Sequence, residues 1–153
     1  MSSEKRTKIP KYGYADLDSG IADIVVELNK KGYLTKCSCE GHLYEYTNKS
    51  WNYNYSPIWL DFKNEACMPP YPPQIEGYTY KRTKPWYDKH SGWYMGEYSP
   101  LKGCIQYGLW VGFSFYKREI KTRGDIHKEH ERVLKEVLKW AQGLPTKEDY
   151  QED

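Results

Sequence analysis

The sequence predicts a single α+β domain, in which an antiparallel or mixed sheet carries helices packed on one of its faces. Two segments, at about residues 18–31 and 125–142, have the apolar spacing of amphipathic helices, and strand-like segments lie between them. The order of the elements is helix, strand, turn, strand, strand, long loop, strand and helix, which is not the alternation of a parallel βαβ fold. We place this domain at residues 12–145 of the 153, between flexible tails at 1–11 and 146–153.

The chain is poor in aliphatic residues and rich in aromatic ones. Leu, Ile and Val together number 23, whereas there are 16 Tyr, 6 Trp and 3 Phe. A low aliphatic content is typical of disordered chains, but those chains also carry a high net charge and few rings. Because the formal net charge is only +2, we expect the chain to fold around a core in which rings supply much of the buried area.

Charge and hydropathy exclude several classes of protein. A nearly neutral chain is not expected to coat duplex DNA by electrostatic attraction. No apolar run approaches the roughly 18–20 residues that span a bilayer, and the N-terminal segment lacks the apolar core of a secretory signal. We therefore expect a cytoplasmic protein with no membrane partner, and we expect its four cysteines to be reduced thiols, at positions 37, 39, 67 and 104.

The first helix has clear signals at both ends. Asp18 or Ser19 can cap its N-terminus, and Gly32 occupies the position where a left-handed residue ends a helix. Its apolar stripe follows helical spacing, with Ile21, Ile24, Val25 and Leu28.

Strands are predicted next. Tyr33–Cys39 reads as a strand with Tyr33, Thr35, Cys37 and Cys39 on one side, and after a turn at Glu40-Gly41 the segment 42–46 can run back beside it. Alternation predicts another strand at 58–62, in which Ile58, Leu60 and Phe62 face one side and Trp59 and Asp61 the other.

The second half of the chain begins with a segment, residues 64–103, that has no periodicity and most of the prolines; we expect a folded-back loop with a short hairpin, or a lid. A strand is predicted at 109–116. A final helix, capped by Asp125 and ended by Gly143, has an apolar stripe formed by Ile126, Val133, Leu134, Val137, Leu138 and Ala141.

The segment with the most chemistry is 35–42, Thr-Lys-Cys-Ser-Cys-Glu-Gly-His, which gathers thiols, a hydroxyl and an imidazole around one glycine. In one interpretation it is a binding turn, in which the Ser38 hydroxyl, backbone N–H groups near Gly41 and the imidazole of His42 cradle a polar or anionic ligand. Alternatively, the turn is a structural hairpin whose small residues only pack against the first helix.

Two reactive alternatives remain open for the same segment. Cys37, Cys39 and His42 could ligate zinc, with a fourth ligand from Cys67, His90 or Cys104, although the spacing is not that of a zinc knuckle. Cys39 could instead act as a nucleophile with His42 as its base.

A resemblance to known proteins lies between Ile21 and Tyr46, in the stretch IADIVVELNKKGYLTKCSCEGHLYEY. It resembles the helix–strand–turn segment of the tRNA wybutosine-synthesising methyltransferase family, whose turn reads Thr-Thr-Ser-Ser-Cys-Ser-Gly-Arg. Matches to that turn are Thr35, Ser38, Cys39 and Gly41, and departures from it are Cys37, Glu40 and His42. The stretch also resembles uncharacterised bacterial and phage proteins with the signature Gly-Tyr-x-Thr-x-x-Ser-Cys-x-Gly-His. The methyltransferase resemblance implies S-adenosylmethionine and a guanosine-derived tRNA base as ligands.

The loop rich in tyrosine and tryptophan supplies a second set of candidate ligand residues. Lys84, Trp86 and Trp93 stand among further lysines and rings, and such a mixture suits nucleotides or single-stranded nucleic acid, because rings stack on bases while cations meet phosphates. A core poor in aliphatic residues could equally use these rings for packing.

Together these observations predict a small cytoplasmic binding protein, of a kind that phages or mobile elements encode. It would recognise a nucleotide or nucleic-acid ligand without turnover and without a cofactor, through Thr35, Ser38, Cys39, Gly41 and His42 and through Lys84, Trp86 and Trp93. The first alternative is a methyltransferase-like enzyme that uses S-adenosylmethionine on RNA. The second is a zinc-stabilised module for protein interaction, and a protein partner or a homo-oligomer is compatible with the aromatic composition.

Overall fold

The computed structural model describes residues 4–10, 12–39, 58–76, 80–81, 91–97, 105–111 and 123–147. Its elements in chain order are β1 (Glu4–Ile9), β2 (Gly13–Asp18), α1 (Ala22–Lys30), β3 (Thr35–Cys39), β4 (Ile58–Phe62), the 3-10 helix η2 (Glu65–Cys67), β5 (Tyr80–Lys81), β6 (Ser91–Glu97), β7 (Ile105–Val111) and α2 (Arg123–Gly143).

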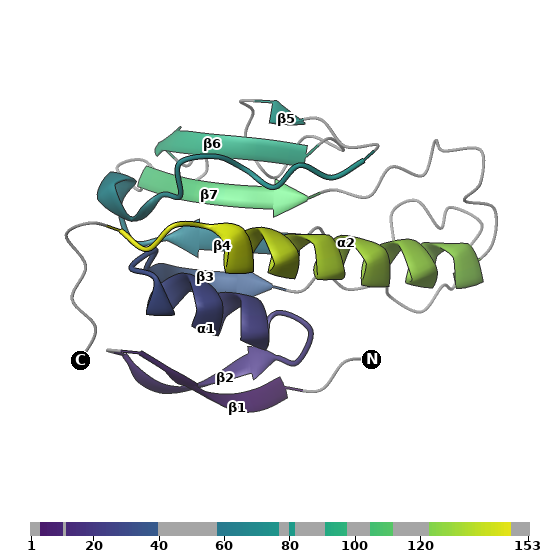
Figure 1. Cartoon of the computed structure of the whole chain (residues 1–153), viewed down its shortest axis with the longest axis horizontal. Coiled ribbons are helices and arrows are strands. Elements are labelled where there is room, and N and C mark those ends of the chain that lie inside the picture. The colour runs from purple at the N-terminus through teal and green to yellow at the C-terminus, as the bar shows by residue number, and fades with distance from the viewer. Residues whose placement is uncertain are drawn as a thin grey trace.

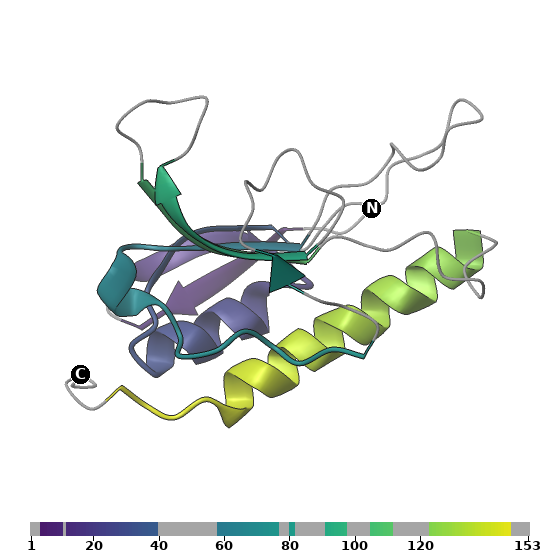
Figure 2. The same cartoon turned by 90° about the horizontal axis from the view of Figure 1, so that it is seen from above.

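The fold is α+β, as the sequence predicts. Strands β3-β4-β7-β6-β5 form a five-stranded sheet in that order, antiparallel except for the parallel pair β5–β6, and β1–β2 form a separate antiparallel hairpin. Both α1 and α2 lie on one side of the five-stranded sheet, as Figure 1 and its turned view in Figure 2 show. Among the described residues, no helix is long and apolar enough to cross a membrane.

The core lies between this sheet and the two helices. Ile58, Leu60 and Phe62 of β4 are fully buried in this core, as predicted, whereas Asp61, which is also buried, belongs to the other face of the strand. They form one cluster with the apolar stripes predicted for the helices, which comprise Ile21, Ile24, Val25 and Leu28 from α1 with Val133, Val137 and Ala141 from α2. Leu134 and Leu138 pack at the margin of this cluster.

The ends of α1 differ in how well the sequence predicted them. The predicted cap at Asp18 or Ser19 is wrong, because the N-cap is Ile21, which makes no side-chain hydrogen bond. A turn in which Ile21 N–H donates to the Asp18 carbonyl precedes the helix, so the helix begins after this turn. The predicted end is confirmed, since Gly32 has φ +96° and follows the C-cap. The helix ends in a Schellman motif with two hydrogen bonds. Gly32 N–H donates to the Asn29 carbonyl and Tyr33 N–H donates to the Leu28 carbonyl.

The N-terminal tail is a further correction. Residues 4–9, expected to be flexible, form β1 and pair with β2 along their whole length. The reason is a short alternation that the surrounding basic residues obscure: Thr7 and Ile9 are buried, and Ala15 and Leu17 on β2 pack against the same core. At the other end, Lys147 N–H donates to the Lys31 carbonyl over 3.0 Å, while 148–153 lie outside the described residues.

The long aperiodic segment contains several short elements. This segment, 64–103, contains the 3-10 helix η2 and the strands β5 and β6. The proline-rich segment that follows η2 runs along α2 (Figure 2). Trp140 Nε1 donates to the Tyr71 carbonyl over 2.9 Å, which attaches this segment to the helix. The predicted strand 109–116 begins four residues earlier than expected, since β7 spans Ile105–Val111. Residues 112–116 and the predicted strand 42–46 lie outside the described residues.

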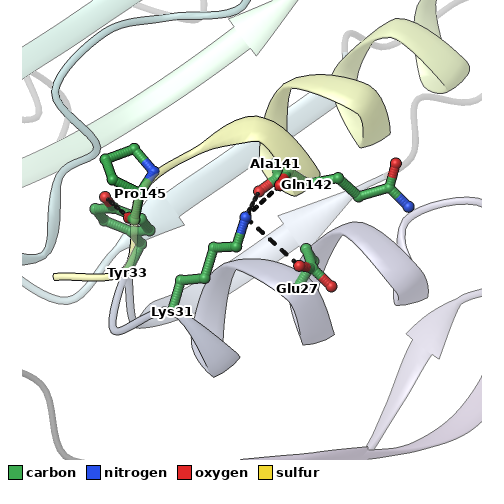
Figure 3. A network of polar contacts seen from close by, with 6 residues as sticks. All are labelled: Glu27, Lys31, Tyr33, Ala141, Gln142 and Pro145. Carbon is green, nitrogen blue, oxygen red and sulfur yellow. Dashed lines mark hydrogen bonds and ion pairs between the residues drawn. The ribbon is translucent and has the colours of Figure 1, made fainter.

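A polar network joins the C-terminal ends of the two helices (Figure 3). Lys31 Nζ donates to the Ala141 and Gln142 carbonyls over 2.9 and 2.5 Å and lies 3.6 Å from Glu27 Oε1. The Tyr33 hydroxyl donates to the Pro145 carbonyl. The last carbonyls of a helix have no partner within it and carry partial negative charge, so the ammonium group complements the end of α2.

Candidate functional site

A β-bulge decides which residues of β3 share a face of the sheet. Thr35 pairs with Phe62, but Cys37 pairs with Asp61, so one extra residue is inserted on β3 between them. Since directly opposed residues share a face, Thr35 belongs to the side of the buried Phe62, whereas Cys37 belongs to the opposite side. The expectation that Thr35 and Cys37 lie on one side of the strand is therefore wrong.

Thr35 has a structural contact on the helix side. Its side chain is buried, and its hydroxyl accepts a hydrogen bond from Asn29 Nδ2 over 3.0 Å, while its N–H donates to Asn29 Oδ1 over 3.3 Å. Asn29 Nδ2 also donates to the Val25 carbonyl. This exchange ties the end of α1 to the start of β3.

The neighbours Ser38 and Cys39 occupy opposite faces. Ser38, which is half-buried, pairs with the buried Leu60, and Cys39 pairs with Trp59. A ligand lying on one face of β3 therefore meets the position of only one of these two residues.

We call the face of the five-stranded sheet opposite α1 and α2 the far face. One of its rows runs through the paired positions Cys39, Trp59, Trp110, Gly92 and Lys81, and the adjacent row through Cys37, Asp61, Gly108 and Tyr94. The positions of Trp59 and Trp110 are thus cross-strand neighbours. In the first row Gly92 follows Trp110, and in the second row Gly108 follows Asp61.

The far-face side chains that the structure describes include Trp59, Asp61 and Cys37. Trp59 is half-buried and its Nε1 donates to Asp61 Oδ1 over 3.3 Å. Asp61 is only 2% exposed, and Cys37, directly opposite on β3, is an exposed free thiol. The hydrogen bond to a buried carboxylate fixes the orientation of the indole ring.

The pKa of the Cys37 thiol lies above its ordinary value. Partial desolvation of the thiol raises the pKa of Cys37, and the negative charge of Asp61 raises it further, while the Lys36 ammonium lowers it. A raised pKa leaves less thiolate at neutral pH, which is the opposite of what a nucleophilic cysteine needs.

The described residues do not include a metal site of the kind that the zinc hypothesis requires. Among them, no group of three or more His, Cys, Asp and Glu side chains could hold an ion. Cys67, expected as a fourth ligand, is buried in the core on the helix side, whereas Cys37 lies on the far face. The structure therefore does not bring these two thiols together. His42, His90 and Cys104 lie outside the described residues.

The predicted residues of the aromatic loop are only partly placed. Trp93 pairs with Leu109, which pairs with Leu60, so the position of Trp93 belongs to the row of the buried Leu60 and not to the far face. Lys84, Trp86, Gly41 and His42 lie outside the described residues.

The far-face residues that sequence reasoning missed are Trp59 and Asp61, with Trp110 and Gly108, which pair with them on β7. The signal was present in the alternation of 58–62, which assigns Trp59 and Asp61 to the face opposite the core. Only the strand order, with β7 beside β4, brings Trp110 next to Trp59.

Comparison of the chain with protein-family models, with curated protein sequences and with solved structures found no significant match.

Proposed function

We propose that this protein binds a nucleotide or single-stranded nucleic acid on the far face of its five-stranded sheet, with Trp59 as a stacking platform and without turnover. The observation that carries the proposal is the half-buried indole of Trp59, which is oriented by its hydrogen bond to Asp61 and belongs to a residue whose cross-strand partner position is Trp110. An indole restrained in this way loses little entropy when a flat ring stacks on it.

The chemistry of the neighbouring positions supports this ligand class. Stacking of a base on an aromatic ring contributes about 1–3 kcal/mol and tolerates any base, because every base has a π-face. Sheets backed by helices present rings to unstacked bases in some RNA-binding domains, which is an analogy of architecture only. Gly92 pairs with Trp110 and Gly108 pairs with Asp61, and neither glycine carries a side chain.

Cations at the ends of the rows suit phosphate groups. Lys81 ends the row of Trp59, and Lys36 is exposed at the bulge beside Cys37. Gly41 and His42 follow Cys39 in the sequence after the single residue Glu40, and we keep them, with Lys84 and Trp86, as proposed contacts to the ligand.

The proposal is tested by fluorescence anisotropy with a labelled oligothymidylate of about twelve nucleotides, and by intrinsic fluorescence with nucleoside monophosphates. We expect saturable binding that Trp59→Ala weakens about 5- to 150-fold, the equivalent of one lost stacking contact. Trp59→Phe is the matched control, because it keeps a ring at the same position and should retain most of the affinity.

Two outcomes contradict the proposal. One is the absence of binding to every nucleotide and oligonucleotide tested, and the other is an affinity that Trp59→Ala leaves unchanged. A calorimetric titration with S-adenosylmethionine completes the test, because saturable heat with that compound would favour the methyltransferase alternative over binding without turnover.

A further inference from the structure

The hairpin β1–β2 has an inner and an outer face. Thr7, Ile9, Ala15 and Leu17 lie on the inner face, against the core that α1 shares. The outer face consists of three cross-strand pairs, Glu4–Asp18, Arg6–Asp16 and Lys8–Tyr14. In Figure 2 the hairpin and the five-stranded sheet lie on the same side of α1, so this outer face and the far face both turn away from the helices.

Basic and aromatic groups gather at the turn end of the outer face. The guanidinium carbon of Arg6 lies 4.8 Å from the centroid of the Tyr14 ring, a cation–π contact that holds both side chains in place. Tyr14 is 58% exposed and Tyr12, whose N–H closes the turn on Ile9, is 63% exposed. Rings this exposed contribute little to the core.

We propose that the outer face of the hairpin contacts the phosphate backbone of the single-stranded nucleic acid whose bases stack on the far face. This inference rests on the proposed function and names its electrostatic component. Arg6 and Lys8 alternate on one strand, so their backbone positions lie about 7 Å apart, a separation that neighbouring phosphates of an extended strand can match. Tyr12 and Tyr14 add π-faces for an unstacked base beside those phosphates.

The pair Glu4–Asp18 limits the contact to the turn end of this face. Asp16 lies opposite Arg6, inside the contact, and offsets part of its charge, whereas Glu4 and Asp18 form the pair farthest from the turn. Phosphates are repelled from that open end, so the footprint covers about two phosphate groups, at Arg6 and Lys8.

A second copy of this chain fits the outer face less well. The basic and acidic ends could pair across a twofold axis, but the outer face has only the six positions of its three cross-strand pairs. Stable protein interfaces use about 20–30 residues on each side. A strand of nucleic acid needs no such area, because its affinity comes from a few charge and stacking contacts.

The test is the salt dependence of oligothymidylate binding by the full chain, between about 50 and 200 mM salt. Each phosphate contact with a single strand contributes about 0.7 to the slope of log K against log salt concentration. We expect Arg6→Gln/Lys8→Gln to reduce the slope by about 1.4, and Lys8→Gln alone by about 0.7. The matched control is Lys128→Gln/Lys135→Gln, which removes the same charge from exposed positions of α2 and should leave the slope unchanged.

The outcomes separate this inference from the proposed function. If the wild type binds and Trp59→Ala weakens it, but Arg6→Gln/Lys8→Gln gives the wild-type slope, the hairpin inference is overturned and the stacking proposal stands. If the wild type binds no oligonucleotide, both are overturned. A concentration-dependent dimer in sedimentation that Arg6→Gln/Lys8→Gln dissociates would overturn the inference in favour of a second copy.

Discussion

At the scale of single residues, the carboxylate of Asp61 is the group that sets the chemistry of the far face. It is almost fully buried, accepts the hydrogen bond of Trp59 and lies directly opposite Cys37 on the neighbouring strand. Its negative charge therefore acts on the thiol and the indole at once.

Asp61→Asn should make Cys37 more reactive. The amide removes a negative charge that raises the pKa of Cys37, yet it can still accept the hydrogen bond of Trp59. The pKa of Cys37 then falls, and alkylation by iodoacetamide at about pH 8 accelerates, as followed by tandem mass spectrometry of the Cys37 peptide. Lys36→Gln is the matched control with the opposite sign, because Lys36 lowers that pKa; equal rates in both variants would contradict the assignment.

Thr35→Val tests whether Thr35 is structural. The isosteric change removes the acceptor of Asn29 Nδ2 inside the core, and we expect a loss of about 1–3 kcal/mol in the free energy of unfolding, measured with urea. Thr35→Ser keeps the hydroxyl and should lose only about 0.8 kcal/mol for the missing methyl group. A variant Thr35→Val that keeps its stability but loses affinity for ligand would return Thr35 to the binding site.

A β-bulge on β3 limits what the sequence alone can predict about the site. The alternation of β4 correctly separates Leu60 from Trp59 and Asp61, because a regular strand has period two. On β3, the single extra residue at the bulge changes which residues share a face, and nothing in Thr-Lys-Cys marks it. Thr35 and Cys37 therefore looked like neighbours and are not.

At the scale of elements, the two helices are held together at their C-terminal ends by Lys31. Its ammonium group meets the Ala141 and Gln142 carbonyls of α2, and its own carbonyl accepts from Lys147 N–H (Figure 3 shows the first two contacts). A residue that ends α1 thus also caps α2.

Lys31→Met should destabilise the protein by about 1–2 kcal/mol, because it keeps the apolar stem but removes the charge that complements the end of α2. The ion pair with Glu27 contributes little of this, since i,i+4 pairs near the surface are worth about 0.3–0.5 kcal/mol. Lys30→Met is the control: Lys30 is exposed and adjacent, and its change should stay within about 0.5 kcal/mol in urea unfolding.

Tyr33 makes the same junction sensitive to alkaline pH. Burial raises the pKa of Tyr33, and Tyr71 adds to the rise, so the folded state favours the neutral phenol that donates to Pro145. A pKa raised in the folded state gives a stabilisation that is complete below the unfolded pKa, near 10, and is lost as pH rises through the folded pKa. We expect urea midpoints to fall as the pH rises above about 10, and to fall less in Tyr33→Phe. Equal falls in both proteins would contradict this role.

Elements with long periodic faces were the ones that the sequence predicted well. The apolar stripe of α1, its end at Gly32 and the end of α2 at Gly143 are all where spacing and glycine placed them. The hairpin was missed because each of its strands has only six residues and its inward positions include the polar Thr7. Tertiary contact with the core, not local pattern, makes it a strand.

At the scale of the whole molecule, the described aliphatic residues are mostly buried, whereas several of the described aromatic residues are exposed. We expected an aromatic-rich core, yet the buried apolar side chains among the described residues are mostly Ile, Leu, Val and Ala, with the rings of Tyr33, Phe62 and Trp140. Tyr12, Tyr14 and Tyr71 are exposed. In the part of the chain that the structure describes, the core is therefore mainly aliphatic, while rings are exposed on the hairpin and half-buried at Trp59 on the far face.

The folded unit includes the hairpin β1–β2, because Ile9 of β1 belongs to the same core as α1. Ile9 is 6% exposed within that core, so Ile9→Ala should lower the free energy of unfolding by about 2–4 kcal/mol, with one urea transition by fluorescence and by circular dichroism. Lys8→Ala, on the outer face of the same strand, is the control and should change it by less than about 0.5 kcal/mol. If Ile9→Ala were as neutral as Lys8→Ala, the hairpin would be an appendage and the folded unit would begin near residue 12, as the sequence alone predicts.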